Sequence, residues 1–154
     1  MNVKTLRDEL RQPGARVGVG LWLMPREYLG KEDAIAAQLD IQALDARQAY
    51  LQNLPPGARF SGLTRPDGYQ NLINLLRNLT QSIHNRDCLL VHTLDLLLLA
   101  LEVNEREYFW HNALAGLPYP HTKLILAIPE KTTELFPSQL KNRYSLQIVQ
   151  GTFD

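Results

Sequence analysis

The sequence predicts an α/β protein of three layers, in which a central, mostly parallel sheet is flanked by helices. Two nearly all-apolar segments, 88–94 and 122–128, have the composition of strands that are covered on both faces. A capped helix separates them, and strands alternate with helices along almost the whole chain. The length of 154 residues suits one domain with a substantial core, and no linker or repeat divides residues 1–154.

The first half of the chain is predicted to alternate between helices and strands. Helices are expected at 3–12, 31–39 and 46–54, and strands at 16–24 and 40–44. In the first strand, Gly18 and Gly20 indicate close approach by a neighbouring element. The clearest helix is predicted at 66–84, where one apolar stripe is formed by Leu72, Leu75, Leu76, Leu79 and Ile83.

The second half contains one ambiguous segment. The leucines at 96–99 either continue the strand before them or form a buried helical turn, because periodicity cannot separate the two. Asn104 is expected to cap the next helix, 105–115, with Glu107 in the capping-box position. The alternating segment 144–149 is typical of an edge strand.

Composition excludes several classes of protein. Lysine plus arginine and aspartate plus glutamate number 16 each, so a strongly basic nucleic-acid surface is not indicated. The single cysteine, Cys88, excludes an intrachain disulfide and favours a buried, reduced thiol in a cytoplasmic protein. The four histidines lack metal-ligand spacing, so no metal site is expected. The apolar stretch 88–101 is too short to span a bilayer, so no membrane association is expected.

The loop after the first strand has part of a phosphate-binding motif. A P-loop needs a glycine, four residues and then Gly-Lys-Ser/Thr, so that backbone N–H groups surround the phosphates and the hydroxyl holds magnesium. Gly30 and Lys31 stand at the right offset, but Pro25 replaces the first glycine and Glu32 replaces the hydroxyl residue. Proline offers no N–H and a carboxylate repels phosphate, so this is an eroded Walker A motif or an ordinary strand-to-helix turn.

Asp95 follows the strand at 88–94, in the place where a P-loop ATPase holds magnesium through an acidic residue. Residues 96–99 are all leucine, so no second acid follows it to activate water, and hydrolysis is not supported. The alternative is that Asp95 caps the next turn of the chain.

With these features, residues 16–149 resemble the P-loop NTPase superfamily in its RecA-like layout. The chain's size and the segments LLVHTLDLLLLAL and ILAIPE are similar to the small P-loop component of bacteriophage-exclusion (BREX) defence systems. The resemblance implies a nucleotide-binding fold, with ATP and magnesium at Gly30, Lys31 and Asp95. It also implies a subunit of a prokaryotic defence or DNA-transaction complex.

Three consecutive aromatic residues form a candidate surface for a protein partner. Tyr108, Phe109 and Trp110 point about 100° apart on a helix, so at least one is expected to face outward. Arg106 on the same helix and Tyr119 in the following loop would extend this surface. Alternatively, Phe109 and Trp110 pack on the sheet and Tyr108 lies at the rim.

Three functions remain open. The first is a non-catalytic interaction subunit of a larger complex that binds protein partners, needs no cofactor and reaches nucleic acid only through the complex. The second is a nucleotide-binding switch or weak ATPase that uses Lys31 and Asp95 with ATP and magnesium. The third is a small metal-dependent nuclease built around Asp95, Glu130 and Lys131, because the strand ends at 95 and 129 are expected to be neighbours.

Overall fold

A computed structural model describes residues 1–15, 17–52, 63, 68–115, 117 and 121–152 of the chain. Its centre is a five-stranded sheet in which every pairing is parallel, in the order β2-β3-β4-β1-β5. The strands are β1 (Val19–Met24), β2 (Gln42–Asp45), β3 (Cys88–His92), β4 (Lys123–Pro129) and β5 (Ile148–Gln150). The predicted α/β fold with a parallel central sheet is therefore confirmed.

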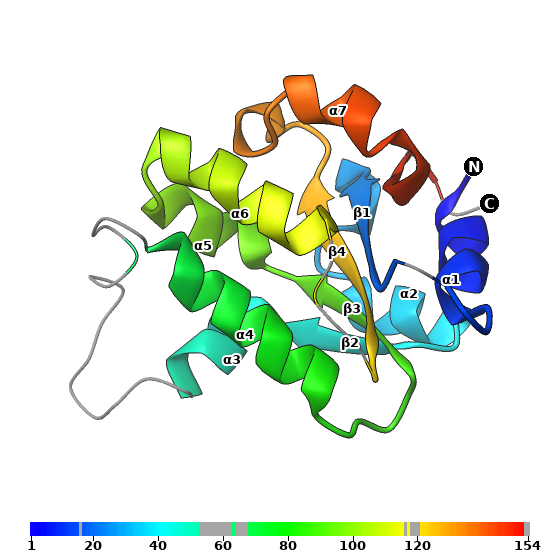
Figure 1. Ribbon diagram of the computed structural model, residues 1–154. Helices are drawn as coiled ribbons and strands as arrows, with labels where there is room; N and C mark the ends of the chain where they lie inside the picture. The colour runs from blue at the N-terminus through cyan, green and yellow to red at the C-terminus, as the bar shows by residue number, and fades with distance from the viewer. Residues whose placement is uncertain (16, 53–62, 64–67, 116, 118–120, 153–154) are drawn as a thin grey trace.

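Helices cover both faces of this sheet (Figure 1). One face carries α1 (Val3–Arg11) and α2 (Glu32–Gln38). The other carries α3 (Ala46–Gln52), α4 (Tyr69–Gln81), α5 (Leu94–Ala100), α6 (Val103–Ala115) and α7 (Gln139–Arg143). Short 3-10 helices are η1 (Arg26–Tyr28), η3 (Thr133–Leu135) and η4 (Ser145–Gln147). In this described part of the chain, no helix has the length and apolar character needed to cross a bilayer.

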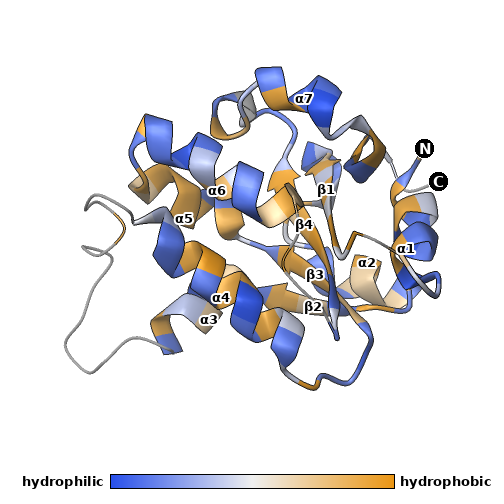
Figure 2. Cartoon of the chain, in the orientation of Figure 1, coloured by the Kyte–Doolittle hydropathy of each residue, from blue (hydrophilic) through white to orange (hydrophobic). Residues whose placement is uncertain are grey.

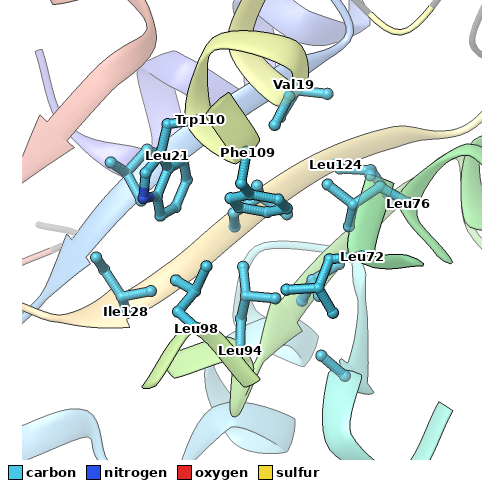
Figure 3. Packing of buried hydrophobic residues seen from close by; sticks show 14 of the residues in the cluster. Val19, Leu21, Leu72, Leu76, Leu94, Leu98, Phe109, Trp110, Leu124 and Ile128 are labelled. Carbon is cyan, nitrogen blue, oxygen red and sulfur yellow. The ribbon is translucent and has the colours of Figure 1, made fainter. Parts of the chain in front are cut away.

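Two separate hydrophobic cores hold the three layers together. On β1, side chains alternate between them: Leu21 belongs to the larger core and Trp22 to the smaller. The larger core packs α4, α5 and α6 against the sheet, and its side chains converge on Phe109 and Trp110 (Figure 3). The smaller core joins α1 and α2 to the opposite face.

The strand order determines which face of the sheet each connecting helix covers. From β1 the chain crosses the sheet in one direction to β2, and it then returns in the other direction through β3 and β4 to β5. Right-handed crossovers in opposite directions place their helices on opposite faces. The helix after β1 therefore diverges from the segments after β3 and β4, which opens a crevice at the carboxyl ends of these strands.

Several predicted boundaries are corrected by the structure. Helix α4 ends at Gln81, so Ile83 lies beyond the apolar stripe with 99% of its surface exposed. Helix α6 begins at Val103, which puts Asn104 inside the first turn and not at the cap. The leucines at 96–99 belong to a helix, α5, and do not continue the strand. The predicted helix start at 66 lies outside the described residues.

Close contact between α1 and β1 explains one of the two glycines in the first strand. A Cβ atom on Gly20 would lie 2.7 Å from Cδ2 of Leu6, whose side chain is buried in the smaller core. The absence of a side chain at position 20 therefore leaves room for the Leu6 side chain of α1 against the sheet, which is the close approach that the sequence predicted.

We expect Gly20→Ala to lower the free energy of unfolding by about 1–3 kcal/mol, because the added methyl group overpacks this contact. Urea denaturation measures the change. In a Leu6→Ala background, where the contact is relieved, the same substitution should cost clearly less. Equal costs in the two backgrounds would contradict the packing explanation.

Cys88 is a buried thiol at the start of β3, as the sequence predicted. Burial raises the pKa of Cys88 to about 12. An exposed thiol in the unfolded chain has a pKa of about 8.5, so between these two values only the unfolded chain releases the proton. The contribution of Cys88 to stability is therefore complete below about pH 8.5 and declines as the pH rises toward 12.

We expect the stability difference between the wild type and Cys88→Ala to shift by roughly 2 kcal/mol between pH 8 and pH 10, against the wild type. Denaturant unfolding at the two pH values measures this shift. All other titrating groups are present in both proteins, so their contribution cancels in the difference. A difference that stays constant with pH would show that the thiol titrates equally in both states.

Candidate functional site

The carboxyl ends of β1, β3 and β4 surround a pocket of about 260 Å³, which we name the switch-point pocket. It brings together two of the predicted nucleotide-site residues, Gly30 and Asp95, and it also confirms that the strand ends near 95 and 129 are neighbours. Its lining consists of Met24, Leu29, Gly30, Glu32, Thr93, Asp95, Leu96, Ala127 and Pro129. The crevice predicted by the strand order is thus a real hollow in the molecule.

The loop between β1 and α2 does not form an open phosphate cradle, because its four backbone N–H groups from Tyr28 to Lys31 already have partners. Three of them donate to carbonyl oxygens within the loop: Tyr28 to Pro25 at 3.1 Å, Leu29 to Arg26 at 3.1 Å and Lys31 to Tyr28 at 3.0 Å. These bonds are those of a 3-10 turn and its continuation. A phosphate at this place would have to break them.

The fourth N–H of the loop is taken by a side chain. Gly30, with φ of 83°, donates its N–H to Oε1 of Glu32 at 3.1 Å. The carboxylate of Glu32 therefore occupies the position of an anionic ligand on the Gly30 amide. Asp33 adds a second carboxylate to the first turn of α2, where the helix dipole would otherwise favour a bound anion.

Lys31 lies outside this pocket. Its side chain is exposed, and no hydrogen bond or ion pair joins it to any residue that the structure describes. It starts α2 without a side-chain cap. Of the three predicted nucleotide-binding residues, Gly30 and Asp95 thus share a pocket and Lys31 does not line it.

The turn between β3 and α5 is strained. Thr93 has φ of 64° and ψ of 12°, a left-handed conformation that a β-branched residue rarely adopts. Such strain costs on the order of 1–3 kcal/mol and is concentrated at functional sites. Nδ1 of His92 lies 2.8 Å from Oγ1 of Thr93 and holds this hydroxyl in place.

Asp95 lies in the first turn of α5, half-buried in the pocket wall. Its carboxylate forms no hydrogen bond or ion pair within the described ranges, and α5 has no side-chain cap. The alternative prediction that Asp95 caps the next turn therefore has no hydrogen bond to support it. The carboxylate is available to a group that enters the pocket.

The proposed nuclease residues do not assemble around Asp95. Glu130 and Lys131 line a neighbouring hollow of about 160 Å³, together with Arg26, and only Leu29 and Pro129 are common to both hollows. In the part of the chain that the structure describes, no group of three or more histidine, cysteine, aspartate or glutamate side chains is placed to hold a metal ion.

The aromatic helix exposes one of its three ring residues. Trp110 is fully buried, where its Nε1 donates to the carbonyl oxygen of Leu135 at 2.6 Å. Tyr108 has 52% of its surface exposed, and its ring lies 5.6 Å from that of Tyr69. The structure therefore has the alternative arrangement, with Tyr108 at the rim, and Trp110 is not a surface residue available to a partner.

Arg106 and Tyr119 were also predicted to belong to the surface for a protein partner. Arg106 donates from Nε to the carbonyl oxygen of Leu98 at 2.9 Å, which ties α6 to the end of α5. It therefore has a structural contact of its own within the fold. Tyr119 lies outside the described residues.

The sequence reasoning missed a group of exposed leucines at the mouth of the pocket. Leu29, Leu96 and Leu99 have 44%, 47% and 52% of their surface exposed. Leu29 and Leu96 line the pocket, and Leu99 lies one turn further along the same face of α5. Helix α5 is hydrophobic along nearly its whole length (Figure 2). Four consecutive leucines on a helix cannot all face the core, which is the signal that would have found them.

A scan against protein-family models and searches of curated proteins and of solved structures found no match to this chain.

We expect Thr93→Asn to raise the free energy of unfolding by about 1 kcal/mol, because asparagine tolerates the left-handed conformation. Thr93→Val keeps the strain and removes the hydroxyl bonded to His92, so it should instead lower stability by about 0.5–1.5 kcal/mol. Thermal and urea unfolding compare the pair. An asparagine variant less stable than the wild type would contradict the assignment of strain to this turn.

Proposed function

We propose that the protein is a non-catalytic assembly subunit of a prokaryotic defence or DNA-transaction complex, built on a nucleotide-binding fold that does not hold a nucleotide. One observation carries this proposal: the four N–H groups from Tyr28 to Lys31 are all bonded, three to carbonyl oxygens of the loop and that of Gly30 to the side chain of Glu32. Triphosphate binding at a P-loop depends on such N–H groups being free and convergent.

Charge and volume support the same conclusion. A phosphate in the pocket would meet the acidic residues Glu32 and Asp95, and no lysine or arginine lines it among the residues that the structure describes. The volume of about 260 Å³ is below the roughly 300–1,000 Å³ of sites that enclose small-molecule ligands. A nucleoside triphosphate would therefore find little enclosure and an unfavourable potential.

The resemblance to the RecA-like layout is supported at the level of strand arrangement. Strand β4 lies between β1 and β3, so the ends of all three strands meet at one place. The hydrolytic part of that machinery is not matched, because the positions after Asp95 are leucines. A relative that keeps the fold for assembly fits this combination.

Exposed apolar side chains supply the interaction surface. Leu29, Leu96 and Leu99 gather at the carboxyl edge of the sheet, beside the pocket. Contiguous exposed apolar side chains on a protein of this size mark contact sites for partners. Tyr108 offers a further exposed anchor on α6.

A nucleotide-binding switch is the second candidate, because Gly30 and Asp95 line the same pocket. A thermal-shift experiment with ATP and magnesium separates the two functions. A ligand at 100 times its dissociation constant adds about 2.7 kcal/mol of stability to the folded state. We expect no shift for the wild type and none for Lys31→Ala.

A shift in the wild type that Lys31→Ala removes would contradict the assembly-only function and favour the switch. Cleavage of DNA or RNA that depends on divalent metal and is lost in Asp95→Ala would also contradict the assembly-only function, and it would favour a metal-dependent nuclease.

A further inference from the structure

The switch-point pocket has walls of two chemical kinds. Its apolar part is formed by Met24, Leu29, Leu96, Ala127 and Pro129. Its polar part is formed by the acidic residues Glu32 and Asp95 and by Thr93. A group that fills it must therefore combine an aliphatic stem with a positively charged, hydrogen-bond-donating end.

We propose that this pocket receives an arginine side chain presented by a protein partner, whose neighbouring apolar residues pack on Leu29, Leu96 and Leu99. The inference rests on the proposed assembly function and names the chemistry of the partner. It assigns to the pocket the role of the central anchor site in that interface.

Charge complementarity selects the cation. Asp95 is half-buried and has no hydrogen-bond or ion-pair partner among the described residues. Oε1 of Glu32 accepts the Gly30 N–H, and its Oε2 can accept a hydrogen bond from a ligand. A planar guanidinium has five N–H donors and can serve several such oxygens at once, whereas an ammonium is a compact point charge that is more strongly hydrated.

Size and surroundings select a single side chain of a larger molecule. The hollow of about 260 Å³ is small for a whole ligand but suits one anchor residue. The exposed leucines around its mouth, with Leu99 beyond the pocket itself, offer apolar contact to the residues on either side of the anchor. Arginine anchors surrounded by such water-excluding contacts are typical of interface hot spots.

The strained turn keeps the pocket in shape. The left-handed Thr93 redirects the chain from β3 into α5, so that Asp95 and Leu96 both reach the pocket wall. The bond between His92 and Thr93 fixes the hydroxyl at the same place. The acceptors are thus positioned before a partner arrives, which lowers the cost of binding.

The test uses the ¹⁵N-labelled full chain and an acetylated, amidated leucine-arginine-leucine tripeptide as the probe. We expect the amide signals of Gly30, Thr93 and Leu96 to shift in a saturable titration. The same peptide with citrulline in place of arginine, which is neutral and nearly isosteric, should bind at least several-fold more weakly. Equal shifts with both peptides, or no shift at these amides up to 10 mM peptide (roughly the limit of a millimolar interaction), would overturn the proposal.

A matched pair of variants localises the effect. Asp95→Asn removes one of the two acidic groups of the pocket with little change of shape and should weaken arginine-peptide binding about fivefold. Asp33→Asn removes an exposed carboxylate of α2 that does not line the pocket, and it should leave binding within about twofold of the wild type. The reverse order of effects would overturn the assignment to this pocket.

Titration with ATP and magnesium in the same experiment keeps the two proposals apart. Shifts with ATP at these amides would mean that the assembly-only function fails. If neither ATP nor the arginine peptide shifts these amide signals, only the inference of an arginine site fails and the proposed assembly function stands.

Discussion

The reversal of chain direction at β2, after the first crossover from β1, is the constraint on which the rest of the structure depends. The helix after β1 lies on one face of the sheet and the helices after β2, β3 and β4 lie on the other, as the general preference for right-handed crossovers requires. This arrangement produces two cores from one sheet. It also leaves the carboxyl ends of β1, β3 and β4 without a helix across them, so the pocket exists for a topological reason before any side chain is considered.

What the pocket can hold is then decided by the hydrogen-bonding needs of a few backbone groups. In a phosphate-binding loop the N–H groups are satisfied by the ligand. Here they are satisfied by the loop and by Glu32, which gives the Gly30 amide an acceptor that is always present at high effective concentration. An intramolecular carboxylate thus occupies the Gly30 N–H, and the remaining charge of the pocket favours a cation.

Sequence reasoning predicted the parts of this fold that depend on continuous apolar composition. The sequence predicts strands β3 and β4 because both of their faces are buried and their residues are nearly all apolar. It also shows that Pro25 and Glu32 depart from the pattern of a phosphate-binding loop. The leucines at 96–99 could not be assigned, since a short apolar run fits either a strand or a helix. The left-handed conformation of Thr93 and the local bond between Glu32 and the Gly30 N–H depend on backbone dihedral angles, which the sequence pattern does not specify.

The most direct test of the central claim is the response of the loop amides from Tyr28 to Lys31 to ATP in nuclear magnetic resonance spectra, with Mn²⁺ as a paramagnetic stand-in for magnesium. If these N–H groups are already satisfied, their signals should neither shift with nucleotide nor broaden selectively with the metal. A saturable shift of the Gly30 amide signal together with selective broadening of the Asp95 amide signal would contradict the account. The two residues would then lie next to a bound nucleotide and its metal.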